Sequence, residues 1–401
     1  MRHHAAHQTR GRCAAGRTLF LQTESSLSES TIPTPATVIK IIGVGGAGGN
    51  AVNHMAPSGL STFEFICANT DAQALSNTLT EKRIQLGESG LGAGSDPMVG
   101  REAAIREREH IAQALKGADM VFITAGMGGG TGTGAAPVVA EVARELGILT
   151  LGVVSKPFEF EGPRRMRVAE EGIATLARCV DSLIIVLNSR LEEVLGDDVT
   201  QKQAFAAADE VLSKAVTGIA DIIAVPGMIN VDFEDVRTVM RQTGMAMMGS
   251  AQHTGDDRAV KAAEEAIACP LLDGANLRAA RGVLVNIAAS EETLKLRETK
   301  LVMNTICAQT NDDAIIKFGA VYDDTLGEAM RVTVVATGLN RPSDLTLGAR
   351  RPAMSRPGAT PQQGLRQGAM HASVRPVSTQ HESRSGGMSR QSASPPDEDG
   401  R

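Results

Sequence analysis

The chain has 401 residues, of which 42 are glycine and 2% are aromatic, and its formal net charge is -6. This length allows two or three hydrophobic cores, and many glycines beside few aromatic rings are typical of α/β proteins with glycine-rich functional loops. The acidic balance excludes a strong overall attraction to nucleic acid or acidic lipid, so we expect no nucleic-acid partner and only indirect contact with membranes.

The cysteines and the hydropathy pattern favour the cytoplasm. The five cysteines are far apart in the sequence, which argues against C-x-x-C metal sites and against a disulfide-stapled secreted domain. No apolar run approaches the roughly 18 residues that span a bilayer, and no secretory signal precedes the first domain. We interpret residues 1–37, which begin with a basic stretch, as a disordered extension, although transit peptides share this bias.

From residue 38 onward, short runs rich in β-branched residues alternate with helical patterns. The runs are VIKIIGV, FEFICAN, ADMVFITA, ILTLGVVS and DSLIIVL. Strands separated by helices predict a doubly wound parallel sheet of the α/β class, which we assign to a domain over residues 38–200. The helix that follows Gly134 is expected to end at Gly147.

A long, largely buried helix is predicted over residues 201–226, because apolar side chains recur there at helical spacing and charges are few. Residues 227–340 alternate helical and strand patterns, which predict a smaller α+β domain with a mixed or antiparallel sheet. Residues 341–401 contain seven prolines and are rich in Ser, Gln and Arg, so they predict a disordered tail.

The stretch GVGGAGGN, residues 43–50, follows a strand and opens a helix, with glycines in the spacing G-x-G-x-x-G. Its backbone N–H groups can bind an anion at the positive end of the helix, and the alternative is a tight turn without a ligand. The second strand ends Asn69-Thr70-Asp71, where a dinucleotide-dependent dehydrogenase has an acid for the ribose. The motif alone is therefore also compatible with a redox enzyme.

A second glycine-rich loop, AGMGGGTGTG at residues 125–134, also lies between a strand and a helix. Its glycines let the backbone approach oxygen closely, and Thr131 and Thr133 add hydroxyl donors. A dehydrogenase does not need this loop. Together with the Gly92–Gly94 turn, the two loops indicate several segments that close on a triphosphate. A P-loop is excluded because Gly-Lys does not occur in the chain.

Six segments, in order, resemble the tubulin/FtsZ family of GTPases. They are GVGGAGGN, NTDAQAL, GMGGGTGTGAAPVVAEVA, PFEFEG, NVDFEDVRTVM and RVTVVATG, and the similarity runs from about residue 38 to 338. The resemblance implies a GTPase that binds GTP or GDP, with Mg²⁺ beside the nucleotide. It also implies head-to-tail polymerisation with copies of itself into the division ring at midcell.

The resemblance implies which residues contact the nucleotide. They are Gly46, Ala47, Gly48, Gly49, Asn50, Gly130, Thr131, Gly132, Thr133, Glu161, Arg165, Asn188, Phe205 and Asp209. The chemistry agrees, because a carboxylate suits ribose hydroxyls or the donors of guanine, and a guanidinium suits phosphate. Without the resemblance, Glu161 and Arg165 would be a surface ion pair and Phe205 a core residue.

Asn230, Asp232 and Asp235 follow the other end of the long helix, roughly 30 Å away, so they cannot reach the γ-phosphate of their own subunit. The resemblance implies that they are catalytic groups for the nucleotide of the next subunit, where acidic groups orient water or hold a cation. The alternative is that Asp232 is the N-cap of a helix with Asp235 in its first turn.

The tail departs from the family pattern. Family tails end in a short apolar-acidic peptide that binds membrane-tethering partners, whereas this chain ends SASPPDEDGR. We expect other division proteins as partners of the tail, and weak contact of its arginines with anionic lipid or acidic proteins is a further hypothesis. A family member with a role other than division also stays open.

Overall fold

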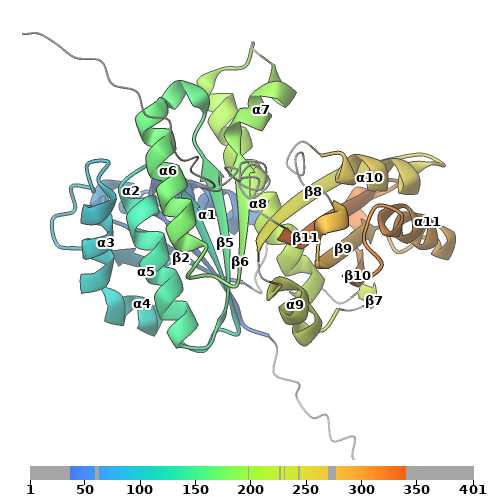
Figure 1. Cartoon of the computed structure of the whole chain (residues 1–401), viewed down its shortest axis with the longest axis horizontal. Coiled ribbons are helices and arrows are strands. Elements are labelled where there is room, and N and C mark those ends of the chain that lie inside the picture. Colours follow the sequence, from blue (N-terminus) through green and yellow to red (C-terminus); the bar gives the residue numbers. More distant parts are fainter. Residues whose placement is uncertain are drawn as a thin grey trace, which may run out of the picture. The chain divides into compact units, whose positions relative to one another are not determined.

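The structure is a computed structural model that describes residues 37–58, 63–196, 198–224, 227–229, 231–242, 244–269 and 277–339. The strands of these residues form one 11-stranded sheet with the order β3-β2-β1-β4-β5-β6-β8-β11-β9-β10-β7 (Figure 1). None of the described helices is both long and apolar enough to cross a membrane. The predicted tail and all but the last residue of the predicted extension lie outside the described residues.

The first six strands form the parallel sheet that the sequence predicts, with one strand more. They are β1 (Ile39–Val44), β2 (Phe63–Asn69), β3 (Lys82–Gln85), β4 (Met120–Gly126), β5 (Leu149–Lys156) and β6 (Ser182–Leu187). All pairings among them are parallel. Sequence patterns miss the edge strand β3 because only Ile84 of its four residues is buried, which gives no apolar run.

Helices cover both faces of this parallel sheet. They are α1 (Gly45–Met55), α2 (Ala72–Ser76), α3 (Pro97–Arg106), α4 (Arg108–Leu115), α5 (Thr131–Glu145), α6 (Pro163–Leu176) and α7 (Asn188–Leu195). Ile41 of β1 packs in one core with α1, and its neighbour Ile42 packs in the opposite core with α3, α4 and α5. The doubly wound prediction is therefore confirmed. Helix α5 ends before Gly147, whose φ is 76°.

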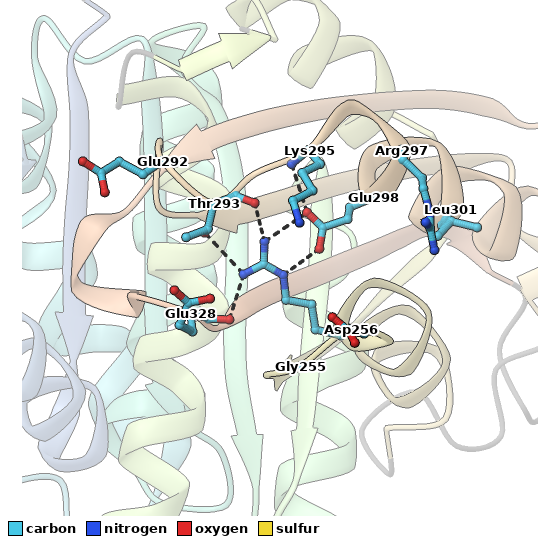
Figure 2. Close-up of a pocket in the computed structure, with 10 residues that line it drawn as sticks. Gly255, Asp256, Glu292, Thr293, Lys295, Arg297, Glu298, Leu301 and Glu328 are labelled. Carbon is cyan, nitrogen blue, oxygen red and sulfur yellow. Dashed lines mark hydrogen bonds and ion pairs between the residues drawn. The ribbon is translucent and has the colours of Figure 1, made fainter.

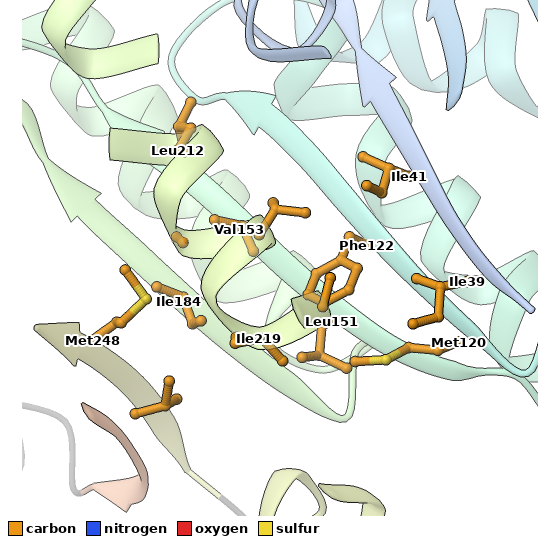
Figure 3. Close-up of a cluster of buried hydrophobic side chains, with 14 of the residues drawn as sticks. Ile39, Ile41, Met120, Phe122, Leu151, Val153, Ile184, Leu212, Ile219 and Met248 are labelled. Atoms are coloured by element: carbon orange, nitrogen blue, oxygen red, sulfur yellow. The ribbon is translucent and has the colours of Figure 1, made fainter. Parts of the chain in front are cut away.

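The central helix α8 (Gln201–Ala224) begins at the first residue of the predicted range 201–226, and residues 225 and 226 lie outside the described residues. Leu212 and Ile219 on its buried face share a core with Phe122 and Leu151 of the parallel sheet (Figure 3). The same core contains Met248 of the C-terminal half. Helix α8 thus packs against both halves of the sheet.

The C-terminal half contains a mixed sheet, as predicted. Its elements are β7 (Gly227–Ile229), α9 (Phe233–Met240), β8 (Met245–His253), α10 (Arg258–Ile267), β9 (Gly282–Ala289), α11 (Leu296–Cys307), β10 (Ile315–Tyr322) and β11 (Met330–Leu339). Strand β11 is antiparallel to β8 and β9, and β9 is parallel to β10. The described residues also form 3₁₀ turns, two in each half of the chain: η1 (Ala56–Ser58) and η2 (Glu159–Glu161), then η3 (Leu277–Ala279) and η4 (Asp324–Leu326).

The two halves share one sheet, which the sequence does not predict. Strand β8 pairs with β6 in parallel through Leu183 with Met245 and Ile184 with Ala246. The sequence MAMMGSAQH of β8 contains Met, Ala, Gly and Ser but no β-branched residue, so its strand propensity is weak. The expectation of two separate sheets is corrected to one continuous sheet with a narrow connection.

Candidate functional site

Helices α1 and α5 begin side by side with uncapped N–H groups. They follow β1 and β4, which are neighbours in the sheet with Val44 opposite Ala125. No side chain caps either helix start, and neither first turn contains an acidic residue. The free N–H groups and the two helix dipoles therefore create an anion site at the carboxyl edge of the sheet.

The two glycine-rich loops touch through glycine. Gly45 has a φ of 75°, and a Cβ atom placed on it would lie 3.0 Å from the backbone nitrogen of Gly132. A Cβ atom on Gly132 would lie 2.4 Å from the carbonyl oxygen of Gly126. A larger side chain at Gly45 would separate the two loops, and one at Gly132 would push the start of α5 away from the end of β4, so the glycines hold both helix starts close to one ligand position.

The first loop contains glycines of two kinds. Gly46 and Asn50 are exposed and Ala47 is half-buried, whereas Gly48 and Gly49 are buried. A Cβ atom on Gly48 would lie 2.3 Å from the carbonyl oxygen of Thr124, while one on Gly46 would meet nothing within 4 Å. Gly48 therefore serves close packing of α1 on β4, and the outer residues are the accessible ones. Nucleotide contact by these five residues stays a prediction.

Hydroxyl groups fix the second loop. The Oγ1 atom of Thr133 accepts a hydrogen bond of 2.9 Å from the N–H of Gly128, and Thr133 is buried. The Oγ1 atoms of Thr131 and Thr70 lie 2.6 Å apart. Sequence reasoning does not assign Thr70 to the site, although Thr70 lies within the NTDAQAL segment. The pair links the end of β2 to the start of α5.

A third loop closes on the same place. A Cβ atom on Gly130 would lie 2.7 Å from Cβ of Ala93 and 2.9 Å from the backbone nitrogen of Asp96. The turn that contains Gly92 and Gly94 therefore packs directly on the second glycine-rich loop. This contact confirms that several loops converge, as the sequence indicates.

Asp71 is the acidic residue that could bind the ribose in the dehydrogenase alternative. In the structure its carboxylate has a different role. Its Oδ1 atom accepts hydrogen bonds from the N–H groups of Gln73 and Ala74, at 2.9 and 3.0 Å. Asp71 is the N-cap of α2, so the structure gives its carboxylate a capping role.

A second group of predicted residues could receive a nucleotide base. Phe205 at the start of α8 is 41% exposed, so the alternative that it is a core residue is wrong. Its ring lies edge-on to Phe158, with centroids 5.2 Å apart. Asp209 follows one turn later, and burial raises the pKa of its carboxyl group to about 6. An aromatic face and a carboxylate therefore share one side of the helix.

Asn188 begins α7 at the carboxyl end of β6, and it is 4% exposed. Within the described part of the chain, its Oδ1 atom has no hydrogen-bond partner. Buried acceptors usually have a donor, so a ligand N–H group would satisfy this one. The position of Asn188 at the same sheet edge fits the predicted contact on the base side.

Glu161 and Arg165 form the ion pair that the alternative interpretation expects. Oε2 of Glu161 lies 2.9 Å from Nη1 of Arg165, and Oε1 accepts a hydrogen bond from the N–H of Phe158. A Cβ atom on Gly128 would lie 2.8 Å from both Cγ and the carbonyl oxygen of Arg165. Arg165 therefore lies against the second glycine-rich loop, where a phosphate contact is also available to it.

Residues 230–235 (NVDFED), here called the acidic loop, lead into the start of α9. Asp232 is the N-cap, and its Oδ1 atom accepts a hydrogen bond of 2.7 Å from the N–H of Asp235. The capping alternative is thus confirmed, and the cap uses Oδ1, which leaves the Oδ2 atom of this exposed residue available for other chemistry. Oδ1 of Asp235 lies 2.7 Å from Nζ of Lys317. Asn230 lies outside the described residues.

The C-terminal half contains a cavity of about 550 Å³ beside Arg258, away from the predicted site residues (Figure 2). Arg258 is 4% exposed and donates to both carboxylate oxygens of Glu298, at 2.7 and 3.0 Å. It also donates to the carbonyl oxygens of Glu328 and Thr293, both at 2.7 Å. Its donors are used within the protein, so this arginine joins α10 to α11 rather than presenting a binding group.

Comparison with known proteins decides between the GTPase and the dehydrogenase. The chain matches the tubulin/FtsZ family GTPase domain over residues 38–196 and the FtsZ family C-terminal domain over residues 244–340. The cell division protein FtsZ of Azotobacter vinelandii is 57% identical over 312 residues, which are 77% of this chain and 79% of that protein. The chain belongs to the tubulin/FtsZ family. It is an FtsZ-type cell-division GTPase and binds GTP, and the dehydrogenase alternative is wrong.

Other relatives agree with this family. The cell division protein FtsZ of Neisseria gonorrhoeae is 52% identical over 318 residues, 78% of this chain and 80% of that protein. The structure of an empty FtsZ dimer from M. jannaschii has a TM-score of 0.72 and 40% identity, and the match covers 76% of this chain and 92% of that one. CetZ2 from Haloferax volcanii, in a GTPγS-bound protofilament, has 20% identity, a TM-score of 0.66 and coverage of 78% and 96%, so it shows only the shared fold.

Proposed function

We propose that this FtsZ-family protein hydrolyses GTP in head-to-tail filaments that form the division ring at midcell, with each active site divided between two subunits. The observation that carries the proposal is the placement of two groups at opposite ends of α8. Phe205 and Asp209 are the fifth and ninth of the 24 residues of the helix, and Asp232 follows its last residue by eight positions. The stretch from Asp209 to Ala224 rises about 22 Å along the helix axis, so the two groups cannot meet within one subunit.

In the proposed complex, the uncapped starts of α1 and α5 receive the phosphates. The backbone N–H groups around Gly46 donate to one part of the triphosphate. Thr131 and the Arg165 guanidinium donate to a different part of it. Phe205 stacks on guanine, and the ionised Asp209 accepts from its two neighbouring donors. Glu161 contacts the ribose through the lone pairs that its internal bonds leave free.

Hydrolysis transfers the γ-phosphoryl group of GTP to water, which releases GDP and inorganic phosphate. We assign the orientation of this water to the exposed carboxylate of Asp232, assisted by Asp235 and Asn230, on the neighbouring subunit. Among the described residues, no three His, Cys, Asp or Glu side chains are grouped as a metal site. A Mg²⁺ ion, which would neutralise phosphate charge, is therefore expected to rely mainly on nucleotide oxygens and water, with at most one or two protein ligands.

A divided site makes hydrolysis depend on assembly. The surface that holds the nucleotide and the surface that holds Asp232 differ, so their contact is heterologous and produces an open filament. The dimeric state of the M. jannaschii relative supports self-association. We also infer a cytoplasmic location at midcell, domains over residues 38–200, 201–226 and 227–340, and binding of other division proteins to the tail.

The first experiment measures assembly and turnover together. Light scattering and phosphate release are recorded with GTP, with ATP and without nucleotide, over a range of protein concentrations. We expect both signals with GTP alone, and phosphate release that rises faster than linearly above a threshold concentration. Light scattering that does not depend on GTP, or phosphate release strictly proportional to protein concentration, would contradict the divided site.

A mixing experiment tests the division directly. Asp232→Ala keeps the nucleotide surface, and Asp209→Ala keeps the acidic loop while weakening nucleotide binding. Each variant alone is expected to hydrolyse GTP slowly. In a mixture, the GTP of an Asp232→Ala subunit meets an intact acidic loop, so phosphate release should exceed the sum of the two separate rates. A mixture that only averages the two rates would place both half-sites in one subunit.

A further inference from the structure

Strand β10 lies directly beneath the acidic loop. Before the loop, β7 pairs with β10 in antiparallel fashion, with Ile229 opposite Ala320. After it, the buried Val231 packs on Gly319, where a Cβ atom would lie 3.2 Å from Cγ2 of Val231. The loop is thus attached to β10 on both sides of residue 230.

Lys317 provides a third attachment. It precedes Gly319 by two positions on β10, so both residues point to the same face of the sheet. Its Nζ atom lies 2.7 Å from Oδ1 of Asp235. The N–H group of Asp235 is bound by Asp232, so Lys317 and the cap together fix the backbone and the carboxylate of one residue.

The charge pattern gives the lysine a specific role. Asp232, Glu234 and Asp235 place three carboxylates within four positions, and Glu234 pairs with Arg237 of its own helix. Within the described residues, Lys317 is the partner that Asp235 has on another element. Because an acidic loop that approaches the phosphates of GTP is repelled, a cation beside Asp235 lowers this repulsion at the subunit contact.

Folding stability does not explain the ion pair. The side chains of Lys317 and Asp235 are 38% and 35% exposed, and ion pairs at this exposure contribute little to stability. In the structure the pair directs the Asp235 carboxylate toward β10. Small errors in the position of a catalytic group reduce rates strongly, so this orientation matters more for turnover than for folding.

We propose that Lys317 is a positioning residue for GTP hydrolysis, which holds Asp235 in the orientation in which it enters the nucleotide site of the next subunit. The inference rests on the proposed function, because Asp235 acts across the subunit contact. Lys317 acts through Asp235 and does not itself touch the reacting atoms.

The test compares Lys317→Met, which keeps the length of the side chain, with Lys317→Arg, which keeps the charge. Phosphate release per sedimented subunit should fall about tenfold in Lys317→Met and largely recover in Lys317→Arg. The melting temperature and the Kd for GTP should stay those of the parent protein in both. Lys261→Met, which removes an exposed lysine from α10, is the matched control and should change none of these quantities.

Asp235→Asn completes the design. If Lys317 acts through Asp235, Lys317→Met should cause no further loss of turnover in the Asp235→Asn background. An undiminished loss there would overturn the proposal, because the lysine would then act independently. Unchanged turnover in Lys317→Met, beside slow Asp232→Ala and Asp235→Asn, would overturn this inference alone. Parental turnover in both acidic-loop variants would instead overturn the proposed function.

Discussion

The two ends of α8 present half-sites of opposite construction. Near Phe205, the site consists largely of backbone: two uncapped helix starts and glycines that allow three loops to touch. Near Asp232, it consists of carboxylates oriented by a helix cap and by Lys317. The first half-site should therefore be sensitive to the volume of side chains, and the second to their charge.

The largest effect is expected from volume in the backbone half-site. In Gly48→Ala, the new Cβ atom would lie 2.3 Å from the Thr124 carbonyl oxygen, so α1 must move away from β4. Overpacking of this kind costs about 1–3 kcal/mol of folding free energy. Because the helix start moves with it, GTP affinity should fall about 100-fold. Chemical denaturation and equilibrium nucleotide binding measure the two effects.

Gly46→Ala is the matched control, because its Cβ atom meets nothing within 4 Å. Alanine is favoured over glycine within a helix, so the free energy of unfolding should stay equal or rise slightly. Any loss of affinity in this variant then reports a nucleotide that approaches Gly46, as predicted. Equal destabilisation by both substitutions would mean that packing does not distinguish these glycines.

The next effect concerns Asp209, whose pKa is clearly shifted. Burial raises the pKa of Asp209 to about 6, and guanine requires the ionised form as an acceptor. The Kd for GDP should therefore rise as the pH falls below about 6, by at most tenfold per pH unit. Equilibrium binding between pH 5 and 7.5 measures this slope.

The pH dependence of folding stability provides a control, because the contribution of Asp209 to it has the opposite sign to its contribution to GDP binding. A carboxyl pKa raised on folding contributes stability that is complete below the unfolded value and is lost as the pH rises through about 6. Loss of GDP affinity in acid therefore does not arise from unfolding at Asp209. In Asp209→Asn, binding should be weak at every pH and the slope should disappear. A slope that persists in this variant would assign the titration to another group.

Much of the fold follows from sequence patterns because the parallel strands are buried on both faces and give continuous apolar runs. The central helix is equally readable, since its buried side chains repeat every three or four residues over 24 positions. Strands such as β3 and β8 are missed because their positions depend on neighbouring strands more than on their own residues. The glycine loops are visible because their composition is unusual for a strand-to-helix connection.

The sequence predicts only part of the site, because several contacts of the site join segments that are far apart in the chain. Thr70 meets Thr131 across 61 positions, and Lys317 meets Asp235 from a strand that carries no motif. A single lysine in a strand has no local signal of its partner. The nucleotide half-site is thus more predictable than the acidic one, since its glycines are required by the local chain geometry.

The smallest expected effect tests whether side chains matter in the backbone half-site. Thr70→Val keeps the shape of the residue but removes the hydroxyl that lies 2.6 Å from Oγ1 of Thr131. One such hydrogen bond contributes about 1 kcal/mol, so GTP affinity should fall about fivefold, as measured by equilibrium binding. If Thr131 also contacts phosphate, Thr131→Val must cost more than Thr70→Val, because it removes both interactions. Equal losses would limit Thr131 to holding the loop, and the phosphates would then be bound by backbone alone.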